Sequence, residues 1–346
     1  MKTKRWFVDV MDELSTNDPQ IAQAAALLRE NEVVAFPTET VYGLGANAKS
    51  TDAVKKIYEA KGRPSDNPLI VHIADISQLD GLTGPAPDKA KILMKRFWPG
   101  ALTLILPCKP GALSPRVTAG LDTVAVRMPD HPLALALIRA AGLPIAAPSA
   151  NLSGKPSPTK AEHVAHDLDG RIAGMMDGGS TGIGVESTVL SCAGETPVLL
   201  RPGGITKEQI EAEIGPILVD KGIADQNEQP ISPGMKYTHY APSAPLVISE
   251  GSPERIQTLI QEYQQGGKRV GVLTTEENAD FYSADYVKSC GRRDQLETVA
   301  AALYDALRSF DEEKVDFIIA ESFPDTGVGL AIMNRLMKAA GGRVIR

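Results

Sequence analysis

The sequence predicts an α/β protein with two domains, a larger one on a mixed, twisted sheet and a smaller, Rossmann-like one on a parallel sheet. A chain of 346 residues exceeds the roughly 250–300 at which a single core usually divides. Helical patterns alternate with short apolar strands on both sides of a stretch without periodicity. We therefore predict a first domain over 15–215, a linker over 216–245 and a second domain over 246–346.

The first domain shows the periods of both helices and strands. Residues 21–32 indicate a helix, and residues 33–36 indicate a short buried strand. By the same criteria we predict helices at 51–61, 86–97, 131–141, 159–167 and 206–214, and strands at 69–73, 101–106, 123–128, 144–147, 187–191 and 197–200. Some of these strands follow one another without a helix between them, so we expect a mixed sheet.

The second domain repeats a simpler alternation. Strands are predicted at 246–249, 269–274, 285–288 and 315–320, and helices at 253–264, 294–310 and 328–340. This order is typical of a small parallel α/β domain. It contains neither GxGxxG nor GxxxxGK[ST]. We therefore expect no redox cofactor and no phosphate loop in it, and interpret it as accessory.

The linker is longer than a simple connection needs to be. Structureless connections usually stay below about 12–15 residues, and this one carries Tyr237, His239 and Tyr240 close together. Solvated linkers are poor in aromatic residues. We interpret the segment as a lid, and a passive tether is the alternative.

Composition and charge exclude several classes of protein. No run approaches the roughly 20 apolar residues of a membrane span, and the N-terminus turns acidic where a signal peptide would be apolar, so we expect a cytoplasmic protein. The three cysteines are widely spaced, which argues against disulfides or a zinc site. Acidic residues outnumber Lys and Arg by 43 to 36, which argues against a broad nucleic-acid-binding field and leaves only a local patch open.

Two cations stand where helix 51–61 ends. Lys61 and Arg63 flank Gly62, so both side chains can reach one anion while the backbone comes close to it. Cations at a helix C-terminus can also do no more than favour the helix dipole. Asn67 and His72 follow, and a histidine buried in an apolar strand needs a hydrogen-bond partner or a ligand. A satisfied core histidine is the alternative.

Polar residues also stand at the ends of other predicted strands. Thr40 follows the first strand, where it could simply satisfy turn backbone groups. Arg127 ends strand 123–128, where it could grip a carboxylate or phosphate with two bonds or be an exposed edge arginine. Ser149 and Asn151 follow strand 144–147, Ser187 stands at strand 187–191, and Arg201 follows strand 197–200. No nucleophile triad or metal cluster accompanies them, so the site should position an anionic ligand, most simply a nucleotide.

Several of these segments resemble the YrdC-like family, in the order that the family has them. They are "KGR" (61–63), "SAN" (149–151), "FPTETVYGLG", "NPLIVH", "STVL" and "RPG", and the similarity covers about residues 15–215. The linker motif "SPGMKYTHYAP" and the C-terminal domain resemble the two-domain members.

This resemblance implies an L-threonylcarbamoyladenylate synthase, a nucleotidyltransferase that makes threonylcarbamoyl-AMP and pyrophosphate from L-threonine, bicarbonate and ATP. Whether bicarbonate or CO2 is consumed is left open, and Mg²⁺ is expected to arrive with ATP. A tRNA threonylcarbamoyl transferase complex would then modify the adenosine beside the anticodon.

The resemblance also implies roles for individual residues. Lys61 and Arg63 would neutralise phosphates during catalysis, and Arg127 would bind the threonine carboxylate. The positions expected to contact ATP are Lys61, Arg63, Asn67, Thr123, Ser149, Asn151, Ser157, Arg201 and Tyr237. Those expected to contact threonine are Thr40, His72, Arg127, Ala147 (through its backbone) and Ser187.

Two other functions compete with this one. An RNA-binding module without synthase activity would use a basic surface, but residues 1–240 hold 24 Lys and Arg against 27 Asp and Glu. A weak contact with tRNA stays open. A sensor binding ATP through the second domain would need a phosphate loop that the sequence lacks.

Overall fold

A computed structural model describes residues 2–10, 14–65, 67–220 and 240–346 of the chain. The described residues form two compact units. The first takes those within 1–153, 158–182 and 186–236, and the second takes those within 154–157, 183–185 and 237–346. Among them no helix is both long and apolar enough to cross a membrane.

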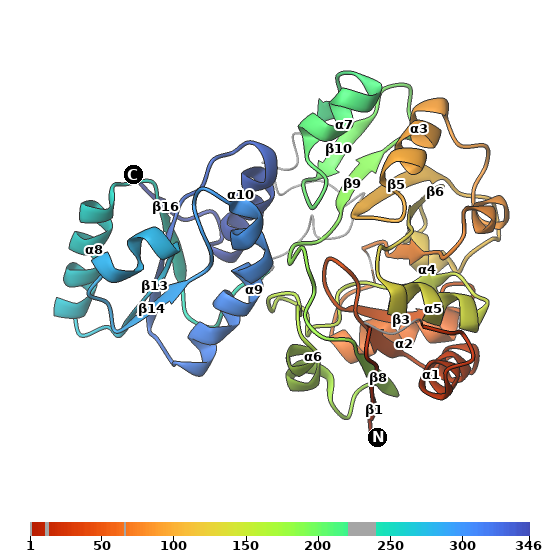
Figure 1. Cartoon of the computed structure of the whole chain (residues 1–346), viewed down its shortest axis with the longest axis horizontal. Helices are drawn as coiled ribbons and strands as arrows, with labels where there is room; N and C mark the ends of the chain where they lie inside the picture. The colour runs from red at the N-terminus through yellow and green to blue at the C-terminus, as the bar shows by residue number, and fades with distance from the viewer. Residues whose placement is uncertain (1, 11–13, 66, 221–239) are drawn as a thin grey trace. The chain divides into compact units, whose positions relative to one another are not determined.

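The first unit contains one large sheet, whose strands run from β1 to β11 in chain order (Figure 1). The strands are β1 (Lys4–Phe7), β2 (Val34–Phe36), β3 (Gly43–Asn47), β4 (Ile70–His72), β5 (Leu102–Pro107), β6 (Thr123–Arg127), β7 (Ile145–Ala146), β8 (Gly174–Asp177), β9 (Thr188–Ser191), β10 (Val198–Arg201) and β11 (Leu218–Val219). The helices are α1 (Pro19–Arg29), α2 (Thr51–Lys61), α3 (Asp88–Phe97), α4 (Pro115–Thr118), α5 (Pro132–Ala141), α6 (Ala161–Leu168) and α7 (Lys207–Ile214), with a 3-10 turn η1 (Ile76–Gly81).

The sheet is mixed, as the sequence predicts. Its spatial order is β1-β8-β2-β3-β7-β4-β6-β5-β9-β10-β11. β4 is parallel to β6 but antiparallel to β7, and β5 is antiparallel to β6 but parallel to β9. Consequently the carboxyl ends of β4 and β6 meet the starts of β5 and β9 at one edge of the sheet.

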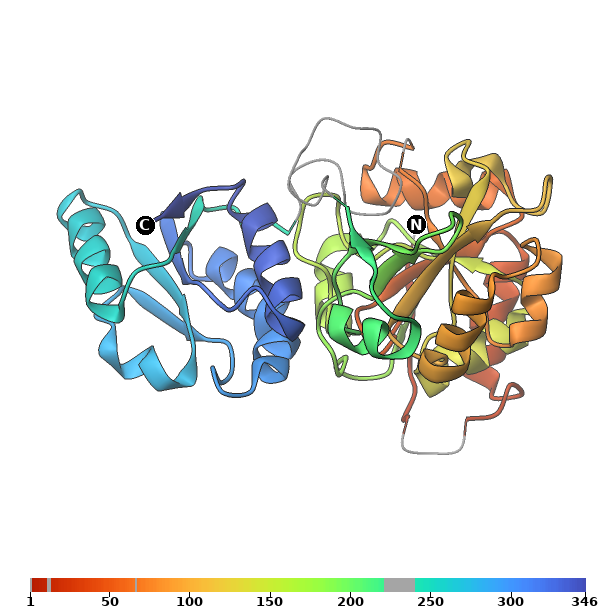
Figure 2. The ribbon, with the colours of Figure 1, turned by 90° about the horizontal axis from the view of Figure 1, so that it is seen from above.

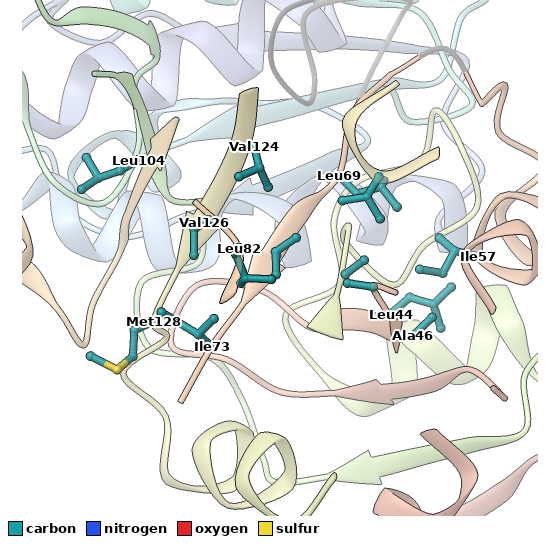
Figure 3. Packing of buried hydrophobic residues seen from close by; sticks show 14 of the residues in the cluster. Leu44, Ala46, Ile57, Leu69, Ile73, Leu82, Leu104, Val124, Val126 and Met128 are labelled. Carbon is teal, nitrogen blue, oxygen red and sulfur yellow. The ribbon is translucent and has the colours of Figure 1, made fainter. Parts of the chain in front are cut away.

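Helices cover both faces of the sheet. Alternate residues of β2 point to opposite faces, so Val34 and Phe36 join the apolar cluster of α1 and α5. Ala35, together with Val33 just before the strand, joins the cluster of α2, α3 and α6. In Figure 3, Leu44 of β3 lies beside Ile57 of α2 within the second of these clusters. Each fully buried side chain of this size contributes roughly 1.5–3 kcal/mol to folding.

Capping residues define both ends of helix α2. Ser50 caps the first turn by accepting from the backbone N–H of Ala53, and Gly62 takes the left-handed conformation with φ 61° at the other end. Glycine adopts this conformation without steric cost. The turn places Lys61 and Arg63 at the junction between α2 and the segment that leads to β4.

The second unit is a parallel α/β unit with strand order β14-β13-β15-β12-β16. Its strands are β12 (Leu246–Ser249), β13 (Val270–Thr274), β14 (Tyr286–Ser289), β15 (Phe317–Glu321) and β16 (Val344–Ile345), and its helices are α8 (Pro253–Gln265), α9 (Leu296–Glu312) and α10 (Gly327–Ala339), with a 3-10 turn η3 (Glu276–Phe281). Figure 2 shows this sheet between α8 on one side and α9 and α10 on the other. The described pairs are all parallel, which confirms the predicted class.

Five strands lie where the sequence indicates a turn, a linker or no element. β3 falls in the segment interpreted as a turn and β11 in the predicted linker, and the sequence patterns do not predict β1, β8 or β16. β3 carries two glycines that strands usually avoid. A Cβ on Gly45 would lie only 2.7 Å from the Phe36 ring and 2.8 Å from Ile145, so close packing against neighbouring strands explains this glycine.

Candidate active site

Lys61 holds the backbone of the turn at 149–151. Its side chain is 3% exposed, and Nζ donates hydrogen bonds to the carbonyl oxygen of Ser149 at 2.5 Å and that of Asn151 at 2.7 Å. Nζ also lies 3.3 Å from Oδ1 of Asn151. The structure thus brings together the two motifs that the sequence singles out, at 61–63 and 149–151, although they lie 88 residues apart.

The neighbours of Lys61 extend this group. Arg63 is half-buried, and its backbone N–H bonds the carbonyl of Tyr58 at 3.0 Å. The Tyr58 hydroxyl donates to the carbonyl of Asn67, whose side chain is buried. Ser149 is half-buried and bridges to Gly43 at the start of β3.

Arg127 is the centre of a second group. It is the last residue of β6 and is 3% exposed, so the alternative of an exposed edge arginine is wrong. Its Nε donates to the carbonyl of Gly100 at 3.1 Å, and Nη1 donates to Oγ1 of Thr40 at 2.9 Å. Nη2 lies 2.5 Å from Oε1 of Glu39. The guanidinium is therefore fixed in orientation by two different segments, the turn that holds Glu39 and Thr40 and the segment that holds Gly100.

His72 lies beside Arg127 on the adjacent strand, because the parallel register of β4 and β6 pairs these two residues. Burial, reinforced by the charge of Arg127, lowers the pKa of His72 to about 3. The imidazole is therefore neutral at physiological pH, and can donate from one nitrogen and accept at the other. Among the described residues its Nδ1 has no hydrogen-bond partner.

Ser187 and Arg201 form a third group at the same edge as Arg127. Ser187 directly precedes β9, and its hydroxyl lies 2.7 Å from that of Thr103 on β5. Arg201, at the end of β10, donates from Nε and Nη2 to the carbonyl of Ser187 at 3.1 and 2.9 Å. Arg201 is 5% exposed. Its guanidinium thus fixes the chain at the start of β9.

The remaining expected residues lie apart from these groups. Thr123 is half-buried at the start of β6, at the opposite end of that strand from Arg127. The backbone N–H of Ala147 bonds the carbonyl of Ile70 at 2.9 Å. Ser157 is buried and belongs to the second unit. Tyr237, and with it most of the expected lid, lies outside the described residues.

The site residues occupy two edges of the sheet and not a single one. Asn67 and Thr123 precede the parallel strands β4 and β6, whereas His72 and Arg127 end them. A five-residue strand spans about 13 Å between its first and last Cα atoms. Of the residues expected to meet threonine, His72, Arg127 and Ser187 therefore lie at one edge, whereas Ala147 bonds Ile70 at the start of β4. Asn67 and Thr123, which are expected to meet ATP, lie toward that other edge.

Sequence reasoning gave no role to Glu39, which the structure places at the heart of the Arg127 group. Its side chain is 13% exposed, and it stands between Thr38 and Thr40. The signal available in the sequence was a single carboxylate within the turn that holds Thr40, a residue already expected to contact threonine. Within the described part of the chain, no group of three or more His, Cys, Asp or Glu side chains could hold a metal ion.

Two family models match the chain, and together they cover most of its length. The family model Sua5_yciO_yrdC, described as "Telomere recombination", matches residues 26–203. The model Sua5_C, described as "Threonylcarbamoyl-AMP synthase, C-terminal domain", matches residues 205–341.

Curated relatives and a solved structure match over nearly the whole chain. The threonylcarbamoyl-AMP synthase of Bacillus subtilis is 90% identical over 346 residues, covering all of both chains. That of Pyrococcus abyssi is 52% identical and covers 94% of this chain and 96% of its own. The crystal structure of P. abyssi Sua5 complexed with L-threonine matches with a TM-score of 0.91 at 49% identity, over 99% of this chain and 98% of that one. The chain therefore belongs to the Sua5/YciO/YrdC family, in the two-domain form that also carries the Sua5 C-terminal domain.

Proposed function

We propose that this chain is a threonylcarbamoyl-AMP synthase, an enzyme that uses L-threonine and ATP. The observation that carries the proposal is the buried Arg127, oriented by Thr40 and Gly100 and paired in register with a neutral His72. A fixed guanidinium in a buried setting suits an α-carboxylate, and a neutral imidazole suits a neutral polar group such as a hydroxyl. The relatives from Bacillus subtilis and Pyrococcus abyssi are named for the same activity.

The reaction needs charge stabilisation more than a protein nucleophile. The amine of threonine condenses with bicarbonate to a carbamate and water, or adds to dissolved CO2. A carbamate oxygen then attacks the α-phosphorus of ATP, and pyrophosphate leaves. Both reactants of the second step are anionic, so cations that hold them in line lower the barrier.

Threonine is proposed to lie at the edge where β4 and β6 end. Arg127 binds its carboxylate, with Thr40 and His72 beside it. The start of β9 at Ser187 and the backbone of Ala147 complete its surroundings. The carbamate oxygen would then attack the α-phosphorus of ATP between this edge and the opposite one, with pyrophosphate as the leaving group.

ATP is proposed to lie toward the other edge. Arg63 and Lys61 supply positive charge there, and Lys61 also shapes the 149–151 turn through its three hydrogen bonds. The proposed ATP contacts are Lys61, Arg63, Asn67, Thr123, Ser149, Asn151, Ser157, Arg201 and Tyr237. Of these, Arg201 lies at the same edge as Arg127. Because the described residues offer no carboxylate cluster, Mg²⁺ would arrive on the triphosphate and not on a protein site.

The wider setting is proposed on chemical grounds. Residues 15–215 would carry catalysis, 246–346 would be accessory, and 216–245 with Tyr237 would close over a labile acyl adenylate and exclude water. The product would pass in the cytoplasm to a tRNA threonylcarbamoyl transferase complex, which transfers the group to the adenosine beside the anticodon.

Pyrophosphate release from ATP by the purified full chain tests the proposal. We expect release only when L-threonine and bicarbonate are both present. Arg63→Ala should reduce the rate at least tenfold, since a charge-assisted contact is worth roughly 1.5–3 kcal/mol. Lys55→Ala, which removes an exposed cation from α2, the helix that precedes Arg63, serves as the matched control and should leave the rate unchanged. Release that needs neither small substrate would refute the synthase.

A further inference from the structure

We propose that Glu39 binds the α-ammonium group of the amino acid substrate, while Arg127 binds its α-carboxylate. The inference rests on the proposed function and adds a residue to it. It concerns the free amino acid, before its nitrogen loses a proton and becomes a carbamate.

The first ground is that Glu39 is a buried carboxylate short of hydrogen-bond donors. Both of its oxygens are inaccessible to solvent, and neither accepts a well-formed hydrogen bond from the described residues. The 2.5 Å approach of Oε1 to Nη2 of Arg127 is an ion pair whose angles are poor for a hydrogen bond. An ionised carboxylate offers about four acceptor positions. A buried one that lacks donors is costly unless a ligand supplies them.

The second ground is the position of Glu39. It stands between Thr38 and Thr40, whose hydroxyl groups lie 2.9 Å apart, and Thr40 in turn accepts from Arg127. The carboxylate is thereby held next to the guanidinium that faces the proposed carboxylate of threonine. An α-amino acid carries its ammonium and carboxylate on one carbon, so its two charges require two adjacent partners of opposite sign.

The third ground is the charge balance of the group. Arg127 and Glu39 together carry no net charge, so a bound zwitterion gives each buried charge a partner of opposite sign. An analogue without the ammonium, such as 3-hydroxybutanoate, would provide no cationic group to Glu39. An analogue without the carboxylate, such as L-threoninamide, would provide no anionic group to Arg127. The pair therefore selects against both.

The same contact has a competing explanation. Glu39 could pair with the Arg127 guanidinium in place of the substrate carboxylate, and would then have to move away when threonine binds. The two explanations predict opposite effects of removing the charge of Glu39. If Glu39 competes with the substrate carboxylate for Arg127, removing its charge would strengthen threonine binding. If Glu39 binds the ammonium group, removing its charge would weaken threonine binding.

Calorimetric titration of the full chain with L-threonine tests the inference, with and without a non-hydrolysable ATP analogue. We expect Glu39→Gln to weaken threonine binding by about tenfold to a hundredfold. We also expect it to reduce the preference for threonine over 3-hydroxybutanoate by a similar factor, with binding of the ATP analogue retained. Asp130→Asn is the matched control. Asp130 is an exposed carboxylate close enough to feel the charge of Glu39, and its removal should change threonine affinity less than twofold.

Each outcome decides a different statement. Unchanged or tighter threonine binding by Glu39→Gln overturns the role of Glu39 and leaves the proposed function standing. Failure of the wild-type chain to bind threonine under either condition counts against the proposed function itself. If thermal melting shows that Glu39→Gln does not fold, the test uses the wild-type chain alone. Binding of 3-hydroxybutanoate as tight as that of threonine overturns the inference. Binding of 3-hydroxybutanoate at least tenfold weaker than that of threonine supports it.

Discussion

At the scale of the residue, the site depends on holding His72 neutral beside a buried cation. Burial disfavours the imidazolium, and Arg127 on the next strand disfavours it further. A second positive charge would repel Arg127 and compete for the acceptors that orient it. The neutral ring instead offers a donor and an acceptor to a polar substrate group.

This arrangement predicts a pH-dependent loss of stability. Above pH 6.5 both states keep the imidazole neutral, and between pH 6.5 and about 3 only the unfolded state binds the proton, so the free energy of unfolding falls as pH falls. The contribution of His72 is at most about 1.4 kcal/mol per pH unit, or about 2 kcal/mol between pH 6.5 and 5. Urea unfolding of the wild-type chain and of His72→Gln at both pH values measures it. Equal pH dependence in the two proteins would contradict the assignment.

At the scale of the element, β3 shows how neighbouring strands dictate sequence. Gly45 pairs with Val34 of β2 and is packed against Phe36 and Ile145, so no side chain fits between them. The strand can therefore lie deep in the sheet and lead its chain to the bridge between Gly43 and Ser149. Packing at Gly45 thus helps to place the 149–151 turn that Lys61 grips.

Substitution of Gly45 by alanine should accordingly destabilise the first unit. The added Cβ would approach two side chains to less than 3 Å, and overpacking of this kind costs about 1–3 kcal/mol. Gly81→Ala is the matched control, since a Cβ there would meet nothing within 4 Å. Midpoints of urea unfolding compare the two variants. If the Gly45→Ala protein were as stable as the Gly81→Ala protein, the prediction would be contradicted, because Phe36 and Ile145 would then be able to shift and accommodate the added Cβ.

Sequence patterns predict the helices and central strands well and the glycine-rich and short strands poorly. Helix 51–61 and strands 123–128 and 246–249 are placed to within a residue, because their periodicity is local. β1 and β8 become strands by pairing with each other across the chain. Glu39 was missed for a similar reason, since its partner Arg127 lies 88 positions later and a lone carboxylate in a turn carries no periodic signal.

At the scale of the whole molecule, the charge distribution opposes nucleic-acid binding. The chain carries a net charge of −7, and its first 240 residues hold fewer cations than anions. Two cations of the site, Lys61 and Arg201, are buried and engaged with protein oxygens. A phosphate backbone attracts proteins through many exposed Lys and Arg side chains, which this chain does not gather in excess.

Binding of tRNA should therefore be weak and readily abolished by salt. In filter binding at physiological salt we expect an affinity no better than the roughly 10⁻⁴–10⁻⁶ M of non-specific contacts. Raising the salt fourfold should remove it, and an unrelated RNA of equal length is the control. Nanomolar binding that distinguishes tRNA from the control would point instead to a dedicated RNA surface.

The pairing of β1 with β8 constrains the order in which the first unit can fold during translation. Lys4 aligns with Gly174, and β2 also finds its parallel partner in β8. During translation the first strand must wait while some 170 residues follow it, which takes about 10–30 s at typical elongation rates. The pairing of β1 with β8 at one end of the large sheet can form only after the residues of the central strands have been synthesised. Until then the apolar residues of β1 are exposed to the cell's chaperones.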